Sequence, residues 1–428
     1  MSIRKELPEL VRADVISQET ANRISSYYNM KSEQGSHRLY LVFGVLGALL
    51  VGLGIILIMA HNWDELSRPV KTGFAFLPLV TGQLLCGYIF FKKPVSIAWR
   101  ESSALFLFFS VGTTLALVSQ TYNIPGSLGP FLLTWMALCL PIIYVMKSSI
   151  VSLFYIAGIT WYASETGYWP YSSEHSTYYW ILLAGVLPYY YVLAKNHPQS
   201  NFTGFHHWVI PLSVTITLGT VAGTATELMF IAYVSLFGFF YLTGNSIYFE
   251  GQRLKRNGYK AVGTLGTVTL LLALSFSGFW DQLSRANLLF SEVITAPEFY
   301  TALIITALAA WLFISQQKGR AWSEIKPLSP VFVLFIALFL YGLIFPGVEI
   351  LINLMVIVIG ILTILDGAKQ NSLGLLNFGM MILAALIICR FFDIQFSFVT
   401  RGLLFVLAGT GFLAANYWML KKRGANES

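Results

Sequence analysis

The sequence predicts an all-α protein, a polytopic bundle of about 14 transmembrane helices. The chain has 428 residues, of which 56% are hydrophobic and only 11% charged, whereas soluble domains carry about 25% charged residues. Its apolar stretches are about 20 residues long, which is enough to cross a hydrocarbon layer roughly 30 Å thick. Lys and Arg gather in alternate connections between these stretches, so the chain is expected to cross the membrane repeatedly.

Fourteen spans account for the distribution of the basic residues. They are predicted at residues 39–60, 69–91, 98–121, 130–146, 149–164, 177–195, 206–222, 227–249, 259–280, 298–315, 328–345, 348–366, 372–390 and 396–419. With the amino terminus inside, 21 of the 27 Lys and Arg residues fall on that side, as the positive-inside rule requires. A count of 12 or 13 would break the alternation, so both termini are predicted to be cytoplasmic.

Three regions follow from this pattern. Residues 1–38 are predicted to form a cytoplasmic amphipathic helical hairpin, in which Ser17 caps a second helix that carries Ala21 on its apolar face. The transmembrane bundle occupies residues 39–420, and residues 421–428 form a basic cytoplasmic tail. The hairpin is too small to enclose a core of its own.

The seventh span, 206–222, allows two interpretations. It contains Pro211 and several threonines, among them Thr215 and Thr217. A broken or re-entrant helix that lines a cavity is one interpretation. A helix that packs through its hydroxyl groups is the other, and it is the more common arrangement.

Two short motifs recur at corresponding points of the chain. The sequence WDELSR at 63–68 follows the first span and WDQLSR at 280–285 follows the ninth, with five of six residues identical. Pro-Gly pairs at 125–126 and 346–347 follow the third and eleventh spans. These motifs predict a parallel repeat in which spans 1–6 match spans 9–14 and two spans are inserted between them (6+2+6).

Polar groups at the outer end of the first span are candidate site residues. His61, Asp64 and Glu65 have the spacing i, i+3, i+4, so they share one face if the helix continues past the predicted span. Such a face suits proton relay or cation binding, because His titrates near neutral pH. The more frequent alternative is an interfacial helix end, where Trp63 anchors in the head groups and the charges face water.

Arg401 is the clearest candidate site residue among the polar side chains, because it lies more than one turn inside the last predicted span. Together with Arg390, it would clamp a phosphate or carboxylate, which guanidinium groups bind with paired hydrogen bonds. The alternative is snorkelling toward the outer head groups, with Asp393 or Glu349 as the counter-ion. The sequence leaves both interpretations open.

Other polar positions are weaker candidates. Glu227 opens the eighth span, and the pair Arg100 and Glu101 reads as an ordinary cytoplasmic helix boundary. Ser110 and Thr114 lie on one face of the third span, a pattern that usually indicates helix packing.

Composition and motifs argue against several function classes. The net charge is +7, but the basic residues sit at span ends and not on one soluble face, so no nucleic-acid partner is expected. Cys86, Cys139 and Cys389 lie in apolar stretches without metal-ligand spacing, so we expect neither a disulfide, a zinc site nor another cofactor. No nucleotide-binding or hydrolase motif occurs in the sequence, so an ATP-driven pump is not expected, and no catalytic residue is assigned.

Several pieces of the sequence together resemble one bacterial family. They are the hairpin ending in Tyr27-Tyr28, the glycine-rich first span, HNWDEL at 61–66, QTYNI at 120–124, RFFD at 390–393 and RG at 401–402. In this order they resemble the predicted membrane proteins of domain of unknown function 2157. The resemblance covers most of the chain, best in residues 1–150. It implies a bacterial inner-membrane setting and brings no activity or site residue with it.

The leading functional hypothesis is a secondary transporter or flippase-like carrier of a small anionic or lipid-linked substrate. Its site would use the outer-side residues His61, Asp64, Glu349, Arg390 and Arg401. One alternative is a membrane-embedded transferase or hydrolase that acts on a lipid-linked substrate at the outer face. Another is a non-catalytic scaffold or sensor whose amino-terminal hairpin binds a cytoplasmic partner.

Overall fold

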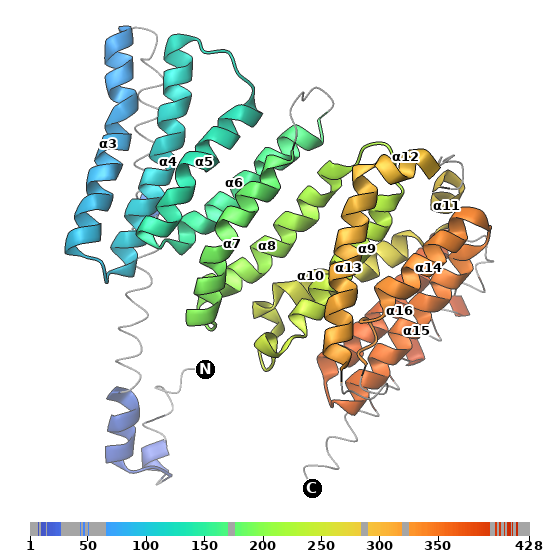
Figure 1. Ribbon diagram of the computed structural model, residues 1–428. Coiled ribbons are helices and arrows are strands. Elements are labelled where there is room, and N and C mark those ends of the chain that lie inside the picture. Colours follow the sequence, from blue (N-terminus) through green and yellow to red (C-terminus); the bar gives the residue numbers. More distant parts are fainter. Residues whose placement is uncertain are drawn as a thin grey trace. The chain divides into compact units, whose positions relative to one another are not determined.

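The computed structural model (Figure 1) describes residues 66–169, 176–283, 290–318 and 325–393. It also describes residues 7, 10–13, 15–26, 43, 46–47, 50, 399, 402–403, 406, 409–411, 413 and 417. The chain divides into two compact units, residues 1–155 and 156–428. All regular structure in the described part of the chain is helical, as the sequence predicts.

Unit 1 contains the first long helices. They are α3 (Arg68–Lys92), α4 (Ile97–Tyr122) and α5 (Leu128–Met146), followed by α6 (Ser149–Gly167), which continues into unit 2. Helix α4 packs against both α3 and α5 (Figure 1). Trp135 of α5 lies against Gly112 of α4, where a Cβ would meet the indole ring at 2.5 Å, and its Nε1 donates to Phe108 O over 2.9 Å. The Thr114 hydroxyl donates to Ala75 O of α3 over 2.8 Å, so the polar stripe of α4 serves helix packing as predicted.

Unit 2 contains the remaining helices. They are α7 (Tyr178–Asn196), α8 (Asn201–Leu218), η2 (Gly219–Val221), α9 (Leu228–Gly244), η3 (Ile247–Phe249), η4 (Leu254–Arg256), α10 (Gly258–Ala273), α11 (Ser277–Leu283), α12 (Phe290–Thr295), α13 (Pro297–Gln317), α14 (Val331–Ile344), α15 (Val348–Lys369) and α16 (Leu373–Asp393).

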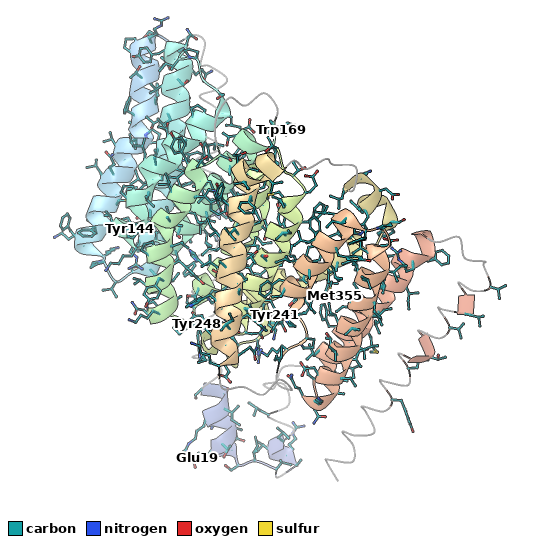
Figure 2. The ribbon with its side chains drawn as sticks, turned by 45° about the vertical axis from the view of Figure 1, so that its right-hand side comes forward. Glu19, Tyr144, Trp169, Tyr241, Tyr248 and Met355 are labelled. Carbon is teal, nitrogen blue, oxygen red and sulfur yellow. The ribbon has the colours of Figure 1, made fainter. Side chains whose placement is uncertain are left out.

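Helix α9 is the central helix of unit 2. It contacts α8, α10, α13 and α14, and 13 of its 17 residues are buried. A helix that is apolar on every side is expected to be enclosed by others. Tyr241 of α9 lies among the surrounding helices in Figure 2 and is 6% exposed.

Six described helices are long and apolar enough to cross a membrane, namely α3, α4, α5, α13, α15 and α16. The number rises to seven if α10 and α11 form one broken span. Helices α9 and α14 are apolar but shorter. The sequence-based total of 14 spans and the parallel repeat stay predictions. The first and last spans lie largely outside the described residues, and the described helices α6, α7 and α8, at the fifth to seventh predicted spans, are not among these six.

Most of the seventh predicted span lies in α8, which starts at Asn201, contains Pro211 and ends at Leu218, where the 3-10 turn η2 follows. Its hydroxyl groups form hydrogen bonds within and between helices. The Thr217 hydroxyl donates to Ser213 O over 2.9 Å, and the Ser213 hydroxyl lies 2.5 Å from that of Thr160 in α6. Helix α8 therefore packs through its hydroxyl groups, as the second of the two interpretations predicts.

The ninth predicted span is interrupted, which the sequence did not indicate. The axes of α10 and α11 differ by 82°, although residues 274–276 between them include neither Pro nor Gly. Side chains of α15 and of α11 itself satisfy backbone carbonyl groups at the break. Asn353 of α15 donates to Ser275 O over 3.2 Å, and Trp280 Nε1 donates to Leu274 O over 2.7 Å.

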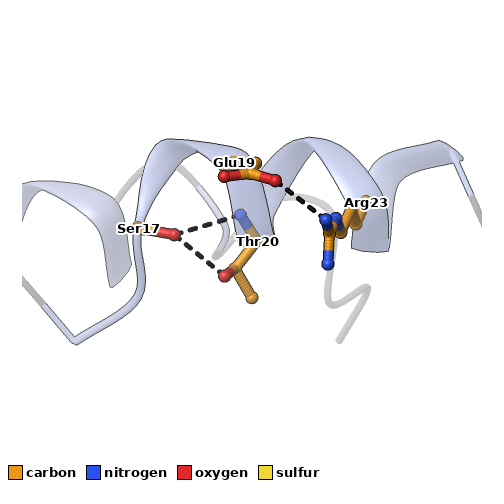
Figure 3. A network of polar contacts seen from close by, with 4 residues as sticks. All are labelled: Ser17, Glu19, Thr20 and Arg23. Carbon is orange, nitrogen blue, oxygen red and sulfur yellow. Dashed lines mark hydrogen bonds and ion pairs between the residues drawn. The ribbon is translucent and has the colours of Figure 1, made fainter.

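The amino-terminal segment confirms one predicted cap. The Ser17 hydroxyl accepts the backbone N–H of Thr20 over 3.2 Å (Figure 3), so Ser17 begins the helix that covers residues 18–26. On the exposed side of the same helix, Arg23 forms an ion pair with Glu19 at 2.9 Å.

Replacing Gly263 by alanine is expected to destabilise the protein by about 1–3 kcal/mol, because overpacking forces the backbone apart. A Cβ at Gly263 of α10 would lie 2.5 Å from Tyr241 N and 2.6 Å from Phe237 O of α9. Gly87→Ala in α3 is the matched control: a Cβ there meets nothing within 4 Å, so it should stabilise its helix by about 0.5–1 kcal/mol. Unfolding in mixed micelles measures both, and equal effects of the two substitutions would contradict this account of the α9–α10 contact.

Candidate functional site: an apolar cavity in unit 2

Two of the five site residues predicted from sequence lie in described parts of the chain. Arg390 of α16 donates from Nη2 to the Ser275 hydroxyl over 3.1 Å, and its guanidinium lies over the Phe276 ring at 4.6 Å. Glu349 lies in the first turn of α15, and its backbone oxygen accepts a hydrogen bond from Asn353 over 2.7 Å. Arg390 and the first turns of α15 thus meet at the break between α10 and α11. His61, Asp64 and Arg401 lie outside the described residues.

An open apolar cavity of about 800 Å³ lies among α8, α9 and α10. This volume is within the roughly 300–1,000 Å³ typical of small-molecule sites. Its walls are largely apolar and include Leu212 of α8, Phe230 of α9 and Leu270 of α10. Neither Arg390 nor Glu349 lines it.

The cavity follows the axis of α10. Lining residues on this helix extend from Val262 to Ala273, a length of about 16 Å at 1.5 Å per residue. Leu283 of α11 closes one end, and Trp208 of α8 lies near the other. This length is about half the thickness of a bilayer's hydrocarbon core.

Few polar groups line the cavity, and among the described residues of its lining Glu227 is the charged one. The Tyr233 hydroxyl donates to Thr215 O over 3.2 Å, so this hydroxyl already has a hydrogen-bond partner within the protein. Glu227 is half-buried, and its Oε2 is buried without a hydrogen-bond partner among the described residues. A carboxylate oxygen in this position favours a ligand that offers a hydrogen-bond donor or a positive charge.

The turn that carries Glu227 is held in place by a second carboxylate. Glu298, in the first turn of α13, is 0% exposed. Its Oε1 accepts the backbone N–H of Gly223, and that of Ala225 over 3.1 Å. Glu298 does not line the cavity, so it acts by positioning the 222–227 turn that forms one cavity wall.

Sequence reasoning missed most of this site. Glu227 was recognised only as a weak candidate, and Glu298 follows Pro297 at a predicted span end, where a carboxylate ordinarily faces water. Two buried histidines of α8 were also missed. His207 Nδ1 pairs with Arg256 O at 2.9 Å, and His206 Nδ1 pairs with Phe202 O at 2.8 Å.

One comparison with known proteins matches the amino-terminal third of the chain to a family model. Residues 8–152 match the family model described as "Predicted membrane protein (DUF2157)". The resemblance inferred from the sequence is therefore confirmed over this part. No curated protein and no solved structure matches the chain. The DUF2157 match and the apolar helices together identify a membrane protein, and the cavity of unit 2 lies beyond the matched residues.

Proposed function

We propose that this protein is a flippase-like carrier of an amphipathic molecule and that the cavity of unit 2 is its binding site. The supporting observation is an elongated apolar cavity that contains a carboxylate oxygen without a partner among the described residues. A hydrocarbon chain matches the apolar walls, and a head group with hydrogen-bond donors matches Glu227.

Interrupted helices border the cavity, which supports movement of the ligand as well as binding. Ala273 and Leu283 line it from either side of the α10–α11 break, and the 222–227 turn forms the wall beside Glu227. Many membrane carriers build their substrate sites from discontinuous helices. A change in the bend between α10 and α11 would change the shape of the cavity directly.

The acidic residue changes the expected chemistry of the head group. An anionic substrate fits the predicted arginine pair, Arg390 and Arg401, and that proposal stays open. The cavity instead favours an ammonium or hydroxyl group beside Glu227. In the proposed setting, a bacterial inner membrane with both termini cytoplasmic, the 222–227 turn faces outward.

Filling the cavity is expected to slow transport at least tenfold. Thr269 of α10 lines the cavity and is exposed, so Thr269→Trp should fit without disrupting the fold. It would exclude several methylene groups of a ligand, each contributing about 0.8 kcal/mol, and about 1.4 kcal/mol corresponds to tenfold. The measurement is movement of acyl-labelled phosphatidylethanolamine between leaflets of proteoliposomes, followed by dithionite quenching. Ile304→Trp, on an α13 side chain that is 59% exposed and outside the cavity, is the control.

The same assay tests the role of Glu227. Glu227→Gln removes a charge-assisted hydrogen bond of about 1.5–3 kcal/mol, so it should reduce the preference for phosphatidylethanolamine over phosphatidylglycerol by about tenfold or more. The proposal fails if wild-type protein moves neither lipid faster than protein-free vesicles do. It also fails if Thr269→Trp and Ile304→Trp transport equally well.

A further inference from the structure

One end of the unit 2 cavity is formed by residues near the starts of α8 and α10. Trp208 and Val262 are the first residues of these two helices that line the cavity, and Phe237 is the last lining residue of α9. This end is therefore opposite Glu227, which precedes α9. Four basic residues at 253–260 predict that it faces the cytoplasm.

Two consecutive side chains of α8 hold two consecutive carbonyl groups of the linker that precedes α10. Trp208 Nε1 donates to Lys255 O over 3.0 Å, and His207 Nδ1 pairs with Arg256 O at 2.9 Å. Because a carbonyl oxygen can only accept, His207 carries a proton on Nδ1. These two hydrogen bonds form a clasp between the linker and the helix that carries Trp208.

The Arg256 side chain reinforces the clasp from the linker side. Its Nη1 donates to Gln199 O over 2.7 Å and its Nη2 to Asn201 Oδ1 over 3.2 Å. The start of α10 also touches α8 directly, because a Cβ at Gly258 would lie 2.3 Å from His207 O. The starts of α8 and α10 and the linker are therefore joined at one point.

Hydrogen bonds, and not apolar packing, hold the clasped part of the linker. No residue from 250 to 256 is buried, and its regular structure is limited to the 3-10 turn η4. Segments with few buried apolar contacts open at a low cost in free energy. Phe249, just before this segment, is buried, and its ring centre lies 4.8 Å from that of His207. Phe249 is thus a fixed point from which residues 250–257 can move.

The clasp is the one feature of His207 that a purely aromatic residue would not reproduce. The His207 ring is 0% exposed, with Tyr190, Tyr248 and Tyr259 around it at centroid distances between 5.7 and 6.1 Å. Its Nε2 is buried without a hydrogen-bond partner among the described residues, which costs stability. Phenylalanine would fill the same space without that cost, so the contribution specific to histidine is the hydrogen bond to Arg256 O.

We propose that the clasp is the inner gate of the unit 2 cavity. When the two hydrogen bonds break, residues 250–257 move away from α8, Trp208 is released, and the cavity opens to the cytoplasmic side. This inference rests on the proposed carrier function, because a carrier exposes its site to each side of the membrane in turn. The break between α10 and α11 borders the other end of the cavity, so the gate and the break lie at opposite ends of α10.

The test is access of an aqueous thiol reagent to the cavity from each side of the membrane. Leu212 lines the cavity one helical turn beyond Trp208, so Leu212→Cys reports passage through the gate. A membrane-impermeant maleimide is applied to inside-out and to right-side-out vesicles that contain the full-length protein. Peptide mass spectrometry separates labelling at position 212 from labelling at Cys86, Cys139 and Cys389.

Breaking the clasp should raise labelling of Leu212→Cys from the cytoplasmic side about two- to tenfold. His207→Phe and Trp208→Phe each remove one hydrogen bond and keep an aromatic ring, and one hydrogen bond changes an opening equilibrium by about this factor. Tyr248→Phe is the matched control. It removes the hydrogen bond from the Tyr248 hydroxyl to Ala194 O, which ties the same linker to α7 and not to α8, so it should leave the labelling unchanged.

The outcomes separate the gate from the carrier function and from general loosening of the linker. An increase confined to His207→Phe and Trp208→Phe supports the gate, and it does so even if the vesicles move no lipid, a result that would refute the carrier function alone. Equal labelling in all variants overturns the gate, as does an equal increase with Tyr248→Phe. If Trp208→Phe fails to fold, His207→Phe still decides the question.

Discussion

Replacing Glu101 by alanine is expected to destabilise the protein by about 3–5 kcal/mol, because the substitution leaves two buried donors and one partly buried donor without an acceptor. The carboxylate accepts the Ser148 hydroxyl and the first two backbone N–H groups of α6, those of Ser149 and Ile150. It therefore caps α6 from the neighbouring helix α4, and its negative charge complements the α6 helix dipole. Unfolding in mixed micelles measures the free energy.

Two further variants sharpen this test. Glu101→Gln keeps one acceptor oxygen and should lose roughly half as much stability. Glu19→Ala removes a carboxylate that is 77% exposed and ion-paired at the surface, so it should cost less than about 1 kcal/mol. Hydrogen exchange should show lost protection at Ser149 and Ile150 in Glu101→Ala. Unchanged protection at these two amides would refute the capping role.

Hydropathy and charge predicted the helices well, because both depend on residues close together in sequence. The third span was predicted at 98–121, and α4 occupies Ile97–Tyr122. The seventh was predicted to begin at residue 206, whereas α8 begins at Asn201. The difference arises because the polar turn 201–207 is helical and buries His206 and His207, each 0% exposed, and hydropathy does not register a helix that begins with polar residues.

The candidate sites were not predictable in the same way, because they depend on contacts between distant segments. Glu298 and its partner Gly223 are 75 residues apart in sequence, and Glu101 and Ser148 are 47 apart. Each glutamate lies at a helix start, where sequence reasoning predicts a solvated boundary residue. Only the packing of another turn against each carboxylate converts it into a buried cap.

The break between α10 and α11 has the same origin. Residues 274–276 contain neither Pro nor Gly, and the local signal is limited to the Ser277-Gly278 pair that begins α11. Asn353 and Arg390, from helices more than 70 residues later, add hydrogen bonds to Ser275. The sequence singled out Arg390 as a candidate substrate-binding residue, whereas its contact with Ser275 lies at a break in a helix that hydropathy predicts to be continuous.

Replacing Glu298 by alanine should disrupt the cavity of unit 2 and also lower the stability of the protein. The loss removes the acceptor for the Gly223 and Ala225 backbone N–H groups, at a cost of about 3 kcal/mol. The 222–227 turn would then shift, and Glu227 would move with it out of its position in the cavity wall. We therefore expect faster hydrogen exchange at residues 223 and 225 and, in the proteoliposome assay, loss of the preference for phosphatidylethanolamine.

Control variants distinguish the loss of the positioning role of Glu298 from a general loss of folding. Glu298→Gln keeps one acceptor oxygen and should retain most of the lipid preference, whereas Glu227→Gln should lose that preference without any change in exchange at the turn. Glu250→Ala removes an exposed carboxylate of unit 2 and should change neither measurement. If Glu298→Ala kept both the protection of the turn and the lipid preference, the turn would be held by other contacts, and Glu298 would have no part in shaping the cavity.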